Sequence, residues 1–107
     1  MNDPYAAVGW TTVDTEEKAK QLCRSLVEQK LVACAQISAP IFSIYSWESE
    51  VHEDEEFRIT LKFLDSKAEA IETFLKSNHP YDTFQWLWAR VEEINGDYFK
   101  WMEGTTS

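Results

Sequence analysis

Several residue types are scarce in this sequence of 107 residues. It has only three glycines and two cysteines, and it has ten basic side chains compared with 19 acidic ones. Three glycines are too few for a glycine-rich loop that cradles phosphate groups. A net charge of −9 repels nucleic-acid backbones, and no apolar run reaches the ~20 residues of a membrane span. We therefore expect neither nucleic acid nor a membrane as a partner.

The sequence also lacks common site motifs. The cysteines and the two histidines, His52 and His79, match no zinc spacing such as C-x2-C. A nucleophile elbow, a Walker loop and an H-E-x-x-H motif are absent too, and we expect no enzymatic activity. Residues 1–4 show no start of a secretory signal, so we expect a cytoplasmic protein with reduced thiols.

Alternating apolar residues predict the strands. Residues 5–13 are expected to form the first strand, and residues 31–47 the second, interrupted at 38–40 by Pro40. Phe57, Ile59, Leu61 and Phe63 alternate with polar residues, which is typical of a strand with one buried face. Residues 83–91 are expected to form the fourth strand.

Two apolar stripes with helical spacing lie between these strands. Their members are Ala19, Leu22, Cys23, Leu26 and Val27 in the first, and Ala68, Ile71, Phe74 and Leu75 in the second. Capping boxes are predicted at Asp14–Glu17 and Ser66–Glu69, and Pro80 should end the second helix by residues 78–79. A short closing helix is expected at residues 97–102, with Asp97 as its cap.

The order β-α-β-β-α-β predicts an α+β, ferredoxin-like fold, with two helices on one face of an antiparallel sheet. We expect one domain over residues 1–107, because the chain contains no linker or repeat.

The second and third strands are long for such a domain. Residues 51–64 would span roughly 45 Å when extended, against a diameter of roughly 34 Å for the whole domain. Their hairpin should therefore overhang the core, and a second copy of the chain would cover it. The alternative is a solvated loop at residues 51–56, with the strand beginning near Phe57.

Several segments, in this order, resemble the CutA family of divalent-cation tolerance proteins. They are LVACAQI, SIYSWESEVHEDEEFRITLKF, HPYD and YFKW. The resemblance implies a tight, PII-like homotrimer whose long hairpins reach over neighbouring subunits. It also implies a role in tolerance of copper and other divalent cations, with no assigned reaction.

The sequence departs from the family pattern at several positions. After His-Pro-Tyr the family has Glu, a small residue, Pro and Glu, whereas this chain has Asp82, Thr83, Phe84 and Gln85. Ser49 replaces a glycine at the hairpin tip, and Phe63 replaces a threonine. Any ligand role of the replaced carboxylates is weakened here.

Candidate metal ligands are Cys34, His79 and Asp82, for Cu²⁺ or another divalent cation. His79 could instead cap the second helix and lock the Pro80 turn through a backbone hydrogen bond. Cys34 could instead be an apolar filler of a central strand. The acidic run at residues 51–56, with His52, could attract cations or form a solvated face.

A second set of candidates is mostly aromatic. Its members could wall a cleft that binds a small molecule, or pack a trimer interface. They are Tyr45, Trp47, Glu56, Lys62, Tyr81, Tyr98 and Trp101. Arg58 is expected to form an ion pair.

Three functions remain open from the sequence. The first is a homotrimer that supports divalent-cation (copper) tolerance by weak metal binding at intersubunit clefts. The second is a PII-like signalling module with a small ligand between subunits. The third is a structural trimer without a ligand.

Overall fold

The computed structural model describes residues 3–107 and contains five strands and three helices in the described part. The elements are β1 (Ala6–Val13), α1 (Glu16–Glu28), β2 (Cys34–Ile37), β3 (Ile41–Trp47), β4 (Glu50–Leu64), a 3-10 turn (Asp65–Lys67), α2 (Ala68–Asn78), β5 (Leu87–Arg90) and α3 (Gly96–Thr106). Among these helices, none combines the length and the hydropathy that crossing a membrane requires.

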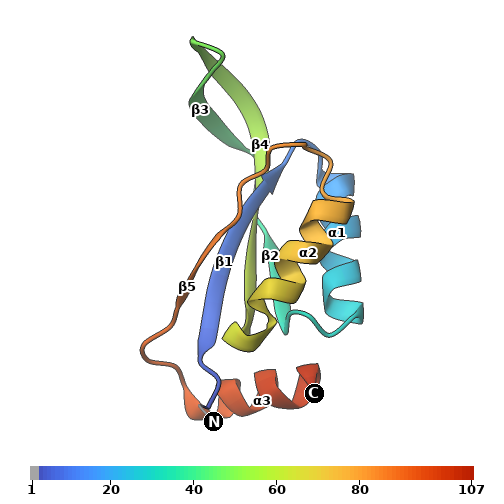
Figure 1. The fold of residues 1–107 in the computed structure, drawn as a ribbon, viewed down its shortest axis with the longest axis vertical. Helices are drawn as coiled ribbons and strands as arrows, with labels where there is room; N and C mark the ends of the chain where they lie inside the picture. The colour runs from blue at the N-terminus through green and yellow to red at the C-terminus, as the bar shows by residue number, and fades with distance from the viewer. Residues whose placement is uncertain (1–2) are drawn as a thin grey trace.

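The strands form one antiparallel sheet with the order β2-β4-β1-β5, and β3 pairs with the outer half of β4. Helices α1 and α2 cover one face of this sheet, and α3 lies across its far end, near the N-terminal end of the chain (Figure 1). The predicted α+β ferredoxin-like fold with a C-terminal helix is confirmed.

The core lies between the sheet and the two helices. Ile59, Leu61 and Phe63 of β4 are fully buried there, because alternate residues of a strand point to the same face. Ile71 and Leu75 of α2 pack against them. The predicted period-2 pattern of this strand is confirmed, with Phe57 partly buried. Both predicted helix stripes are buried except at Val27, which is 42% exposed, and Phe74, which is partly buried.

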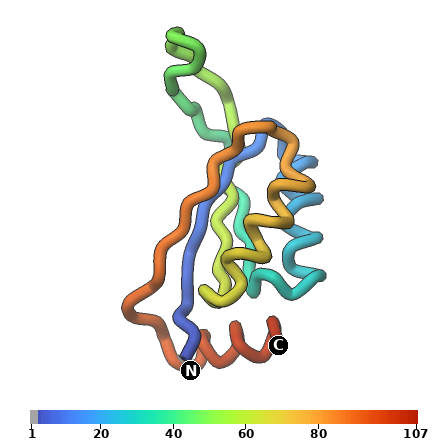
Figure 2. Tube along the Cα trace, in the orientation of Figure 1, coloured from blue at the N-terminus to red at the C-terminus, as the bar shows by residue number. Residues whose placement is uncertain are grey.

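The hairpin of β3 and the outer part of β4 projects beyond the core as a ribbon, as the trace in Figure 2 shows. It makes the molecule elongated, with extents of 46 × 25 × 24 Å. Because β4 begins at Glu50, the alternative of a solvated loop at residues 51–56 is wrong. Glu48 and Ser49 form the tip and both have left-handed backbone angles, with φ of 50° and 67°.

All three predicted helix caps were wrong. Thr15, not Asp14, caps α1, because its hydroxyl accepts the N–H of Lys18 at 3.2 Å. Asn95, not Asp97, caps α3 by accepting the N–H of Tyr98, and α3 continues beyond residue 102. At α2, a 3-10 turn precedes the helix, and no side chain caps it, so Ser66 does not form a capping box.

Two predicted strands are shorter than expected. Residues 31–33 lie outside β2, which begins at Cys34. The N–H groups of Leu31 and Val32 bond to the carbonyl of Leu26 and finish α1, and that of Ala33 already bonds to Lys62 of β4. Residues 83–86 do not join β5, and Phe84 instead stacks on the ring of His79 with the centroids 4.7 Å apart. The segment between α2 and β5 is therefore a loop, and it crosses the base of the ribbon (Figure 1).

Candidate functional site

A cleft of about 570 Å³ lies where the ribbon leaves the core. Three parts of the chain form it: the end of β1 with the residue after it, the facing strands of the ribbon, and the loop that follows α2. Its lining residues are Thr12, Asp14, Tyr45, Trp47, Asp54, Glu55, Glu56, Tyr81, Asp82, Thr83 and Gln85. The structure thus brings together five predicted site residues: Tyr45, Trp47, Glu56, Tyr81 and Asp82.

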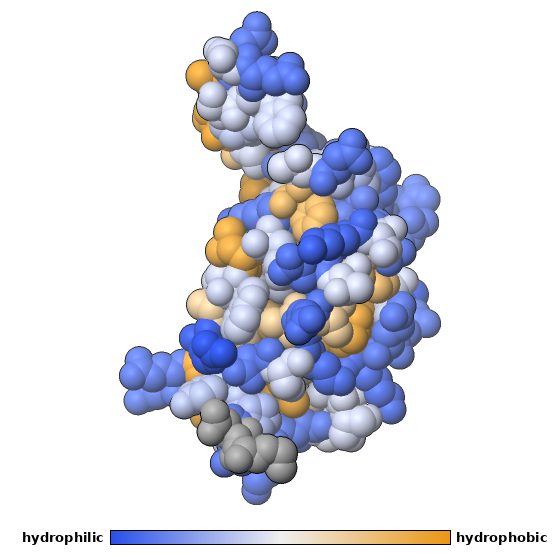
Figure 3. Space-filling view, viewed as in Figure 1, coloured by the Kyte–Doolittle hydropathy of each residue, from blue (hydrophilic) through white to orange (hydrophobic). Residues whose placement is uncertain are grey.

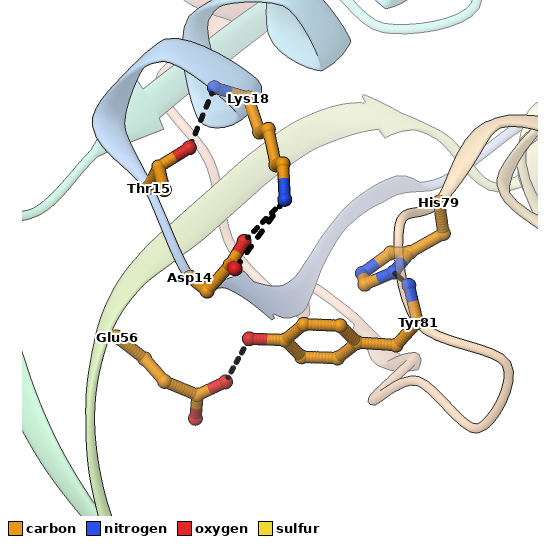
Figure 4. A network of polar contacts seen from close by, with 6 residues as sticks. All are labelled: Asp14, Thr15, Lys18, Glu56, His79 and Tyr81. Atoms are coloured by element: carbon orange, nitrogen blue, oxygen red, sulfur yellow. Dashed lines mark hydrogen bonds and ion pairs between the residues drawn. The ribbon is translucent and has the colours of Figure 1, made fainter.

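Two tyrosines that line this cleft donate hydrogen bonds to carboxylates of the ribbon. The hydroxyl of Tyr81 donates to Glu56 at 2.8 Å, which joins the loop to β4 (Figure 4). The hydroxyl of Tyr45 donates to Asp54 within the ribbon. Burial, together with the bond to Glu56, raises the pKa of Tyr81 well above its usual 10. The bond to Asp54 also raises the pKa of Tyr45, so both phenols stay protonated.

His79 ends α2 and fixes the loop through both nitrogens of its ring. Its Nδ1 accepts the N–H of Tyr81 at 3.1 Å, and its Nε2 lies 3.0 Å from the hydroxyl of buried Thr11 (Figure 4 shows the first contact). Burial lowers the pKa of His79 below its usual 6.5. The predicted backbone hydrogen bond that locks the Pro80 turn is therefore present.

In the contact between His79 and Thr11, the histidine could act as a general base and the threonine hydroxyl as a nucleophile. Their hydrogen bonds and burial exclude this role. Because Nδ1 accepts a hydrogen bond, the neutral ring carries its proton on Nε2, which then donates to Thr11. A general base needs a free lone pair at that position. Thr11 is also fully buried, so no substrate reaches its hydroxyl.

Two carboxylates complete the cleft beside the loop. Asp14 follows β1 and pairs with Lys18 at 3.2 Å. Asp82 is exposed and follows Tyr81 in the loop. Asp14 and Asp54 were not predicted from the sequence as cleft residues. Asp54 could have been predicted as a cleft residue, because it lies two residues from Glu56 and so points to the same face of the strand.

Three predicted site residues lie at the opposite end of the molecule. Lys62 stands over the ring of Tyr98, with its nitrogen 5.8 Å from the ring centroid, and Tyr98 lies 5.4 Å from Trp101. Lys62 is six residues beyond Glu56 on β4, which is about 20 Å of extended strand. Within one chain these residues do not reach the cleft. Arg58, expected in an ion pair, belongs to none of the described ion pairs.

Cys34 is separated from His79 by the sheet. Cys34 pairs with Lys62, whereas Thr11, which contacts His79, pairs with Ile59 on the face covered by the helices. Residues 59 and 62 of one strand point to opposite faces. Among residues 3–107, no group of three or more His, Cys, Asp or Glu side chains is arranged to hold a metal ion. The candidate ligands Cys34, His79 and Asp82 thus form no site within one chain.

Comparisons with known proteins agree on one family. A family model described as "CutA1 divalent ion tolerance protein" matches residues 7–105. The divalent-cation tolerance protein CutA of Thermus thermophilus is 33% identical over 95 residues, covering 89% of this chain and 92% of that protein. The crystal structure of the divalent ion tolerance protein CutA1 from Ehrlichia chaffeensis has a TM-score of 0.93 at 30% identity, covering 99% of both chains.

Some relatives are longer than this chain. The protein CutA homolog of Xenopus laevis is 33% identical over 96 residues, which cover 90% of this chain and 64% of that protein. The chain thus spans less than two thirds of the length of this relative. The family model covers residues 7–105, which form the fold shown in Figure 1.

Proposed function

Because the chain belongs to the CutA1 divalent ion tolerance family, we propose that it supports divalent-cation tolerance as a homotrimer that binds metal ions weakly at clefts between subunits. The observation that carries this proposal is the acidic cleft at the base of the ribbon. Five of its lining residues are carboxylates: Asp14, Asp54, Glu55, Glu56 and Asp82. We propose residues 1–107 as one such domain, of which residues 3–107 are described.

The exposed ribbon supports the homotrimer. One of its faces carries Phe42, Ile44 and Val51, which are 73%, 67% and 78% exposed. Figure 3 shows apolar side chains along the side of the ribbon. A two-stranded ribbon is marginally stable alone in water, and a second copy of the chain is the simplest cover for it. The cleft residues Tyr45, Trp47, Asp54 and Glu56 lie on the other face of the ribbon.

A trimer would also explain the scattered site residues. Lys62 lies about 20 Å along β4 from Glu56 of the cleft, and Tyr98 and Trp101 lie beside Lys62. The overhanging ribbon reaches beyond its own core. We propose that these three residues complete the cleft of a neighbouring subunit. Cys34, His79 and Asp82 would likewise ligate Cu²⁺ or another divalent cation only as a set drawn from more than one subunit.

Weak metal binding is consistent with the donors in the cleft. Carboxylates are hard ligands that bind divalent cations loosely when they do not converge on one point. Glu56 and Asp54 already accept hydrogen bonds, and Asp14 is paired with Lys18. Asp82 belongs to no described ion pair or side-chain hydrogen bond, so we propose it as the first metal contact.

Metal titration tests this proposal. Cu²⁺ and Zn²⁺ should raise the Tm of the wild type, because a ligand that binds only the folded state stabilises it. Asp82→Asn should reduce the increase. Asp97→Asn, which removes the same charge on α3, should leave it unchanged. No metal-dependent rise in the wild type, or equal rises in both variants, would contradict metal binding in the cleft.

A second role is supported by the size of the cleft. At about 570 Å³ it lies within the range of small-molecule sites, ~300–1,000 Å³. The chain would then act as a PII-like signalling module, without enzymatic activity, whose ribbon or loop responds to a small ligand. A structural trimer is the remaining alternative if neither metals nor small molecules bind.

We also propose a cytoplasmic location. Cys23 and Cys34 are both free thiols, as expected in a reducing compartment. Burial raises the pKa of the Cys23 thiol to about 12, which keeps it unreactive in the core. Cell fractionation with an antibody against the chain tests the location.

A further inference from the structure

The size of the cleft fits a molecule better than a bare ion. A volume of about 570 Å³ accommodates many non-hydrogen atoms, and no three metal-binding side chains converge among the described residues. Two of its three walls, β4 and the loop after α2, are joined by the bond between Tyr81 and Glu56. The cavity is thus formed without help from a ligand.

The charge of the lining selects a cation. Five of the lining residues within one chain are acidic, although Glu55 pairs with Phe42 on the opposite face of the ribbon, and none is lysine, arginine or histidine. The Lys62 side chain that we propose a neighbouring subunit contributes adds one positive charge, and the lining stays negative. Lys18 reaches only Asp14, with which it pairs at 3.2 Å. An anion would meet uncompensated negative charge, whereas a cation would gain several carboxylate partners.

Three aromatic residues add an apolar surface to the carboxylates of the cleft. Tyr45, Trp47 and Tyr81 all line it. Both tyrosine hydroxyls already donate to carboxylates, and His52 stacks against Tyr45 at 5.6 Å and supports that ring. These rings therefore offer apolar, electron-rich surface, which attracts organic cations through cation–π contacts.

We propose that this cleft binds a small organic cation, an amine or quaternary ammonium compound with an apolar skeleton. The skeleton packs on the aromatic walls, and the charged nitrogen faces Glu56 and Asp82. The inference rests on the small-ligand role proposed above and names the chemistry of that ligand. Bare metal ions use the carboxylates only and gain nothing from Trp47.

Calorimetric titration of the full chain with 1,4-diaminobutane tests the proposal. The protein is first freed of metal with a chelator, and 1,4-butanediol serves as the uncharged analogue of the same length. Saturable binding is expected for the diamine and none for the diol. Raised salt should weaken the binding, because exposed charges are screened.

Variants assign the binding to the cleft. Glu56→Gln should weaken it about tenfold, since a charged contact is lost while the amide oxygen still accepts from Tyr81. Glu53→Gln is the matched control, because it removes the same charge from the opposite face of the ribbon and should leave affinity unchanged. Trp47→Leu should weaken binding roughly threefold and Trp47→Phe less, since only the ring supplies a cation–π contact. Circular dichroism checks that each variant is folded.

The outcomes separate this inference from the proposed function. No saturable diamine binding, or equal loss in Glu56→Gln and Glu53→Gln, would overturn it. If a panel of nucleotides and small anions binds instead, the inference fails and the small-ligand role stands. If Cu²⁺ raises the Tm and the diamine does not bind, the metal role stands alone. If diamine binds as expected and metals do not, only the metal role is lost.

Discussion

His79 connects the end of α2 to the wall of the cleft. Its two ring nitrogens hold the N–H of Tyr81 and the hydroxyl of Thr11. Its ring also stacks on Phe84, which belongs to the same loop. Ligation of a metal by His79 would require one of these nitrogen contacts to break. Within one chain the residue therefore supports the loop, and the metal binding proposed for a trimer would replace one of these contacts.

The neutral state of His79 should make stability depend on pH. Burial lowers its pKa in the folded protein below the usual 6.5, so the unfolded chain takes up the proton first as the pH falls. The contribution to the unfolding free energy is fully present above about 6.5 and is lost as the pH drops below that value. Urea midpoints measured between about pH 7.5 and 5.5 should therefore decrease toward the acidic end.

His79→Asn should flatten this dependence, because asparagine does not titrate and its side-chain oxygen can accept the N–H of Tyr81. His52→Asn on the ribbon is the matched control and should keep the wild-type slope. The same slope in His79→Asn and the wild type would show that another group is responsible.

Gly9 allows the ring of Trp86 to approach β1 closely. A Cβ atom at residue 9 would stand 2.6 Å from Cη2 and 2.8 Å from Cζ3 of Trp86, and 3.1 Å from Cβ of Trp88. Gly9→Ala should therefore destabilise the fold by about 1–3 kcal/mol, the usual cost of overpacking. Thermal or urea unfolding measures the change.

Gly104 in α3 is the matched control, because a Cβ there meets no atom within 4 Å. Gly104→Ala should stabilise the protein by roughly 0.5–1 kcal/mol, since alanine loses less entropy than glycine in a helix. Equal effects of the two substitutions would contradict the close contact at Trp86.

The end of α1 shows how an element is stopped without glycine. The N–H of Leu31 bonds to the carbonyl of Leu26 at 3.1 Å, and that of Lys30 bonds to Val27 at 3.0 Å, which is a Schellman motif. Lys30 takes the left-handed position of this motif, with φ of 60°. A residue with a Cβ is strained there.

Lys30→Gly should accordingly raise the unfolding free energy by about 1 kcal/mol. Gln29→Gly is its control, since Gln29 has an ordinary φ of −82° and glycine there only adds freedom to the unfolded chain. That variant should be less stable than the wild type in the same urea titration. Stabilisation by both substitutions, or by neither, would argue against strain at Lys30.

The sequence predicted the elements better than their ends. Ile59, Leu61 and Phe63 reveal a half-buried strand by their alternation alone, because one face of the sheet must meet the helices. The caps were misplaced because Asp14, Thr15, Asp97 and Asn95 are all good capping residues, and only the backbone angles select one. The loop at residues 83–86 was predicted as strand because its aromatic residues have high strand propensity. Their side chains instead pack on His79 and Gly9.

Only part of the candidate site was predicted, because a sequence pattern does not show how far apart two residues lie in the fold. Tyr45, Trp47, Glu56, Tyr81 and Asp82 were chosen from the family pattern, and they meet in one cleft. Lys62, Tyr98 and Trp101 were chosen by the same argument and lie at the other end of the chain. Strand parity places a residue on a face, but it gives no position across neighbouring strands or between subunits.

The whole molecule is elongated because its ribbon projects from the core. The ribbon extends the longest dimension to 46 Å and exposes Phe42, Ile44 and Val51. An exposed apolar surface of this kind on a protein marks an interaction site. Both proposed roles of the cleft use residues at the base of the ribbon, so both depend on how the ribbon is held in place.

Sedimentation equilibrium at micromolar concentration tests the homotrimer most directly. A homotrimer should give one species with three times the 12.5 kDa mass of the chain. Ile44→Asp should shift it toward smaller species, because burying an unpaired carboxylate is costly. Thr73→Asp, on the exposed side of α2, should remain assembled. A folded wild-type chain that sediments at 12.5 kDa would contradict the homotrimer.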